Sequence, residues 1–96
     1  EQPMPALSGQ KTVTTAGSAV QLGNQAINAP LMVKALDTNT GIVAIGNDGN
    51  NNVTTSNGLR LSAGESVIFE FVANLADLWL NSAISGEGVS WILLSA

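Results

Sequence analysis

Turn-forming residues divide this chain into short segments, and their spacing most constrains what it can fold into. Gly, Asn, Asp and Pro recur along the chain and are densest in Asp37–Gly41 and Asn47–Asn52. Helix signals are nearly absent. The exception is Ala73–Leu80, but its Asn74 and Asp77 fit a turn better than a helix interior. The spacing therefore favours strands joined by turns.

The segments between the turns are rich in β-branched and apolar residues, the composition of strands. The hairpin signal Asn57-Gly58 separates two of them. About seven to nine short strands at such spacing are typical of an all-β antiparallel sandwich or barrel. No alternation of strands with helices occurs, which excludes α/β nucleotide-binding folds. We expect strands over 11–15, 19–22, 31–36, 42–45, 53–55, 59–61, 66–72, 78–81 and 89–94.

The missing residue types exclude most enzyme chemistry. The 96 residues suffice for one domain and include no His and no Cys. This removes typical zinc sites, thiol nucleophiles, disulfides and a Ser-His-Asp triad. The oxygen-rich segment 47–52 has too few carboxylates for a calcium loop. The remaining acids lie in turns, and their spacing favours no catalytic pair. We therefore expect no enzyme, no cofactor and no metal site.

Charge and hydropathy restrict the partners. The chain has three Lys and Arg and seven Asp and Glu, so its net charge is −4. This acidic balance argues against a nucleic-acid groove. No apolar run approaches the roughly 20 residues that cross a membrane, and no signal-peptide pattern is present. We expect neither nucleic acid nor membrane as a partner. Charged residues are only 10% of the chain, so Asn, Ser, Thr and Gly must keep the surface polar.

Three expected strands, 31–36, 66–72 and 89–94, are apolar on both faces. Strands of an antiparallel sandwich normally alternate between apolar and polar residues, because one face meets solvent. A chain of this length has too little material to cover both outer faces itself. We therefore expect copies of the chain to associate.

Residues 1–10 differ from the rest, so we expect an extended N-terminal arm before a single β-sandwich domain over 11–96. Pro3 and Pro5 remove two backbone donors and impose extended geometry on their neighbours. Met4 and Leu7 are apolar in a segment too short to bury them. Two interpretations remain open: a frayed terminus, or an arm that lies on a neighbouring subunit.

The two tryptophans also allow two interpretations. Trp79 and Trp91 stand among Leu and Ile residues, which indicates a core or a subunit interface. Exposed tryptophans also stack on sugar rings, which would suit a carbohydrate-binding module. The candidate oligomer or capsid interface residues are Pro3, Met4, Pro5, Leu7, Trp79 and Trp91.

Six segments in a fixed order resemble a known kind of protein: 17–22 (GSAVQL), 32–36 (MVKAL), 39–46 (NTGIVAIG), 58–66 (GLRLSAGES), 78–80 (LWL) and 88–91 (GVSW). Together, over about 16–94, they resemble the small all-β virion proteins of tailed bacteriophages, of the head-completion and capsid decoration (cement) type. The pair NTGIVAIG and LSAGES is the most specific part.

This resemblance implies a compact jelly-roll-like β-sandwich without catalytic residues. It implies a homotrimer that binds the major capsid protein at subunit junctions and stabilises the head. The protein would be assembled in the host cytoplasm and lie on the capsid exterior of the virion. Similar folds serve in tails and fibres, so the alternative is a carbohydrate- or receptor-binding module of a phage fibre or tail.

Overall fold

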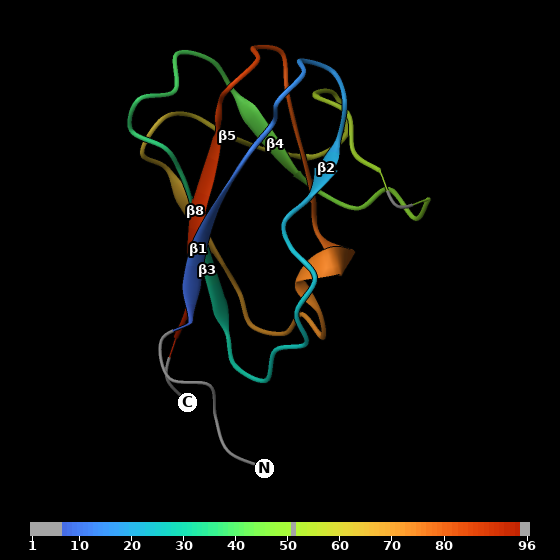
Figure 1. The fold of residues 1–96 in the computed structure, drawn as a ribbon, viewed down its shortest axis with the longest axis vertical. Coiled ribbons are helices and arrows are strands. Elements are labelled where there is room, and N and C mark those ends of the chain that lie inside the picture. Colours follow the sequence, from blue (N-terminus) through green and yellow to red (C-terminus); the bar gives the residue numbers. More distant parts are fainter. Residues whose placement is uncertain (1–6, 51, 95–96) are drawn as a thin grey trace.

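The computed structural model describes residues 7–50 and 52–94, which form two four-stranded antiparallel sheets packed as a sandwich (Figure 1). A short 3₁₀-helix, η1 (Leu75–Asp77), precedes the seventh strand. The strands are β1 (Ser8–Thr12), β2 (Val20–Gln21), β3 (Leu31–Ala35), β4 (Val43–Gly46), β5 (Leu59–Leu61), β6 (Ser66–Phe69), β7 (Trp79–Ser82) and β8 (Gly88–Leu93).

The strand order is that of a jelly roll. Sheet I has the order β1-β8-β3-β6 and sheet II the order β2-β7-β4-β5. The first strand thus pairs with the last, the second with the seventh, the third with the sixth and the fourth with the fifth. This is one long hairpin wound into two sheets, the arrangement of eight-stranded jelly rolls. The expected all-β sandwich is confirmed.

The core lies between the sheets and follows the two-residue period of the strands. In β3, Leu31, Val33 and Ala35 are fully buried and face sheet II. From sheet II, Val43 and Ile45 of β4 face them, so the residues between these positions point outward. The inner faces carry no charged residue among the buried positions of the core cluster. Hydrophobic burial at this interface is therefore the main stabilising contribution.

The bounds of β1 and β6 depart furthest from the expectation. β1 begins at Ser8, so residues 8–10 of the expected arm belong to sheet I, where Gln10 lies opposite Ser90 of β8. β6 ends at Phe69 rather than at residue 72, and Phe71 beyond it is exposed. The ends of β1 are set by its pairing with β8, and the end of β6 by its pairing with β3. Local composition does not show where such pairing stops.

The expected hairpin around Asn57-Gly58 is wrong. The β5 strand pairs with β4, and Val53–Thr55 is no strand. The side chain of Asn57 accepts a hydrogen bond from Thr54 N, and Asn57 N and Gly58 N both approach Thr54 O. These bonds close a turn over 54–58 that directs residue 53 back onto sheet II.

Candidate interaction surface

The outer face of sheet II is covered in part by the chain itself. Residues 52–58 return to it, and Val53 lies fully buried above Ala44, whose side chain points outward from β4. Asn81 Nδ2 donates to Val53 O at 2.8 Å and so fixes the segment to β7. Gly58 makes this packing possible, because a Cβ there would lie 2.5 Å from Val53 Cγ2.

The outer face of sheet I has no such cover among the described residues. Met32 of β3 lies between Ile68 of β6 and Ile92 of β8, and all three side chains point away from the core. Ile68 is 50% exposed and Ile92 37% exposed. We call these three residues the apolar row. Aligned on adjacent strands about 4.8 Å apart, they form a continuous apolar strip.

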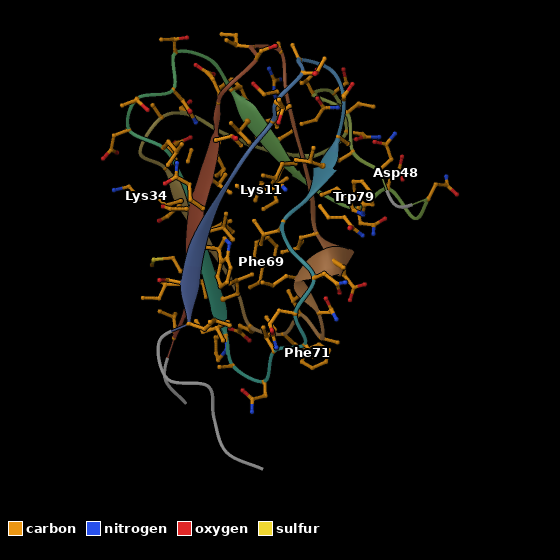
Figure 2. The ribbon with its side chains drawn as sticks, viewed as in Figure 1. Lys11, Lys34, Asp48, Phe69, Phe71 and Trp79 are labelled. Carbon is orange, nitrogen blue, oxygen red and sulfur yellow. The ribbon has the colours of Figure 1, made fainter. Side chains whose placement is uncertain are left out.

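The next row on the same face is polar. Gln10, Ser90, Lys34 and Ser66 follow one another across the four strands. Lys34 Nζ lies 3.6 Å from Asp37 Oδ1, so the charge of this lysine has a nearby counter-charge. Figure 2 shows Lys34 on the sheet I side of the molecule, with Asp48 and Trp79 on the opposite side. The exposed Glu70 follows β6 two residues after Ile68, so a carboxylate lies beside the apolar row.

The end of the sandwich beside the apolar row carries further exposed apolar groups. Phe71 is 82% exposed and lies at the lower end in Figure 2. It lines an open pocket of about 290 Å³ between the segments 27–30 and 70–72. Pro30, also in the lining, accepts a hydrogen bond from Leu94 N and so joins this end to the strand of Ile92.

Leu7 lies at this end as well. Its side chain is 37% exposed, and its carbonyl oxygen accepts a hydrogen bond from Leu93 N, the residue after Ile92. The structure thus brings one of the expected interface residues next to the apolar row. Three others, Pro3, Met4 and Pro5, lie outside the described residues.

The two tryptophans do not share a surface. Trp91 lies on the inner face of sheet I, packs against the core and covers Gly9, where a Cβ would lie 2.8 Å from the indole ring. Trp79 is half-buried on sheet II, opposite Gly46, and its buried Nε1 has no hydrogen-bond partner in the described structure. Packing against the core accounts for Trp91, and the two side chains lie on different sheets.

Sequence reasoning missed the apolar row. The signal was present, because 31–36, 66–72 and 89–94 were apolar on both faces. It could not show that Met32, Ile68 and Ile92 lie side by side, since strand order and register decide this.

The best-defined polar cluster surrounds Glu87, which is buried. Its carboxylate accepts hydrogen bonds from Thr40 N, from Thr40 Oγ1 at 2.8 Å and from Gly41 N at 3.0 Å. The Thr40 N–H is the main reason why the pKa of Glu87 lies below its ordinary value, against the opposing effect of burial. Because these donors bind both oxygens, the carboxylate connects the loop at residues 40–41 to the turn before β8.

Within 7–50 and 52–94, no three His, Cys, Asp or Glu side chains gather as metal ligands. No helix in this part of the chain has the length and hydropathy to cross a membrane. Comparisons with protein-family models, curated proteins and solved structures find no match. The fold and the surface therefore define the class of protein: a jelly-roll sandwich in which the described residues partly cover the outer face of sheet II and leave that of sheet I open.

Proposed function

We propose that this chain is a structural protein of a bacteriophage virion, a capsid decoration protein. It binds the lattice of the major capsid protein as a homotrimer and stabilises the head. The observation that carries the proposal is the exposed apolar row on the outer face of sheet I of a jelly roll. The assignment to a phage rests on the resemblance of the six sequence segments described above.

A rigid sandwich with an open face suits this task for a physical reason. A decoration protein needs shape and contact surface, and it needs neither a reactive group nor a cofactor. Each contact with the lattice can be weak, because subunits that bind several sites at once gain affinity through avidity. The net charge of −4 keeps the copies soluble and gives them no attraction to the packaged genome.

The alternative is a carbohydrate- or receptor-binding module of a fibre or tail. Sugar recognition through tryptophan needs an open indole face. Both Trp79 and Trp91 are half-buried, and Trp91 packs against the core. The structure therefore supports the decoration role better than glycan binding through these residues.

Co-sedimentation with capsids tests the proposal. We expect the chain to pellet with capsids of the encoding phage that lack their decoration protein, and to raise the temperature at which these capsids open. Light scattering of the free chain should give a trimeric mass. A chain that stays in the supernatant and leaves capsid stability unchanged would contradict the proposal. Binding on a glycan array that Trp79→Ala abolishes, with the fold intact, would support the alternative.

A further inference from the structure

We propose that the Asn57-Gly58 pair is a site of spontaneous deamidation, at which the folded protein converts an asparagine into aspartate and isoaspartate. The pair lies in the turn over 54–58 and belongs to the covering segment, residues 52–58, on sheet II. The reaction needs only water. Neither a partner nor assembly enters this chemistry, so it does not depend on the proposed function.

The reaction requires a backbone amide that can reach the side-chain carbonyl carbon of the preceding asparagine. Gly58 N loses its proton to solvent and attacks Asn57 Cγ, and the bond from Cγ to Nδ2 breaks as Nδ2 takes up a proton and leaves as ammonia. Water then opens the cyclic imide that has formed. Opening between the nitrogen and Cγ gives aspartate. Opening at the backbone carbonyl gives isoaspartate, whose main chain is longer by a methylene group.

Gly58 supplies an unhindered nitrogen. A side chain on this residue would shield its backbone nitrogen, and glycine has none. The covering segment requires this glycine, because a Cβ would lie 2.5 Å from Val53 Cγ2 and 3.0 Å from Ala44 Cβ. The hydrogen bond from Gly58 N to Thr54 O is 3.3 Å long, beyond the roughly 2.7–3.2 Å of a normal bond. Packing thus keeps the residue that makes the pair reactive, and only a weak bond restrains its N–H.

Asn57 supplies an exposed and polarised amide. Its Oδ1 accepts a hydrogen bond from Thr54 N at 2.8 Å, which draws electron density away from Cγ. Among the described residues, none accepts a hydrogen bond from Nδ2, so the leaving group is unrestrained. Because Asn57 lies in a turn before β5, its backbone can rotate toward the ring geometry without breaking strand pairing.

Two other asparagines each lack one of these conditions. Asn81 precedes Ser82 but is buried, and its Nδ2 donates to Val53 O at 2.8 Å, so its leaving group is held. Asn52 is exposed but precedes Val53, whose branched side chain shields the backbone nitrogen. Asn57 is the only asparagine in the sequence that is followed by glycine.

The two products differ in their effect on the fold. Aspartate keeps an oxygen for Thr54 N and adds a negative charge at an exposed position. Isoaspartate lengthens the main chain next to Gly58, whose close contact with Val53 depends on the length of the turn. Its formation therefore loosens the covering segment from sheet II.

Storage of the folded protein in mildly alkaline buffer, sampled over weeks, tests the site. Trypsin cleaves after Lys34 and Arg60, so Asn57 and Asn81 fall in different peptides. Fragmentation of each peptide locates the mass change from amide to acid and distinguishes aspartate from isoaspartate. We expect both products at Asn57, before any product at Asn52 or Asn81.

Two variants check the assignment. Asn57→Gln should lose the reaction at this position, because the longer side chain closes a larger ring more slowly. Asn52→Gln is the matched control, since Asn52 is an exposed asparagine of the same segment, and it should leave the reaction at Asn57 unchanged. An unmodified chain after storage, earlier product at Asn52 or Asn81, or aspartate without isoaspartate at Asn57 would overturn the proposal.

Thermal melting tests the consequence for the fold. Asn57→Asp should melt close to the unmodified chain, because it keeps the oxygen that accepts from Thr54 N. The stored sample, once it contains isoaspartate, should show a fraction that melts at a lower temperature than Asn57→Asp. A stored sample that contains isoaspartate and melts as Asn57→Asp does would overturn the loosening of the covering segment.

Discussion

The burial and the hydrogen bonds of Glu87 are the features that are hardest to predict from the sequence. In the sequence it stands between Gly86 and Gly88, which indicates an exposed turn. In the structure it is buried, and its carboxylate connects the turn before β8 to Thr40 and Gly41. The neighbouring Gly88 lies so close to β1 that a Cβ would be 2.1 Å from Lys11 O. Both features depend on contacts between distant segments, so local composition could not predict them.

The lowered pKa of Glu87 predicts a pH dependence of stability. Because the folded state favours the ionised carboxylate, Glu87 stabilises the fold above the ordinary carboxyl pKa. This contribution is lost as the pH falls through the lowered pKa of the folded state. We expect Glu87→Gln to lower the melting temperature at neutral pH, and the difference from the unmodified chain to shrink in acid.

Thermal melts from neutral pH down to about pH 3, below the ordinary pKa of a glutamate carboxyl group, measure this difference. Glu70→Gln is the control, because Glu70 is exposed beyond the end of β6. A Glu87→Gln variant whose melting curve matches the unmodified chain at neutral pH would contradict the role assigned to this carboxylate.

At the scale of elements, the sequence predicts strands well and their partners poorly. The expected strands 31–36 and 89–94 correspond closely to β3 and β8. The signal Asn57-Gly58 correctly indicates a turn but leads to a wrong hairpin, because β5 pairs with β4. Turn composition is a local property, whereas strand pairing depends on which apolar faces can be buried together.

The covering segment 52–58 gives a prediction at this scale. Val53→Ala removes two buried methyl groups from the contact with Ala44 and Gly58, so we expect a loss of about 2 kcal/mol in the free energy of unfolding. Chemical denaturation measures it. Ser56→Ala, at an exposed position of the same segment, should leave the stability nearly unchanged. Equal stabilities of both variants would show that the segment does not contribute to the fold through Val53.

At the scale of the whole molecule, the sequence predicts the all-β sandwich and an association of copies, but not the place of the apolar row. Of the expected interface residues, Leu7 lies beside the apolar row, while Trp79 and Trp91 lie on different sheets. The apolar row itself arises only when β6, β3 and β8 assemble in register. A surface composed of three distant segments has no signature in any one of them.

Deletion of residues 1–6 tests the contribution of the N-terminal segment to association. The fold should persist, because β1 begins at Ser8 and is held by β8. We expect weaker self-association, since Pro3, Met4 and Pro5 are removed, and a melting temperature near that of the unmodified chain when both are monomeric. Sedimentation and thermal melting measure the two effects.

A chain whose first six residues are replaced by Gly and Ser is the control, because it keeps the length and removes the apolar side chains. If the truncated chain associates as strongly as the unmodified chain, the segment is a terminal tail with no role in association.

The pairing of β1 with β8 has a consequence for folding kinetics. Ser8 meets Ile92 near the two ends of the described chain, whereas Val43 meets Leu61 in its middle. Closing the outer pair has the larger entropic cost, so assembly should start at β4 and β5 and proceed outward. During synthesis, β1 leaves the ribosome before its partner exists. The strand that is made first is the one that docks last.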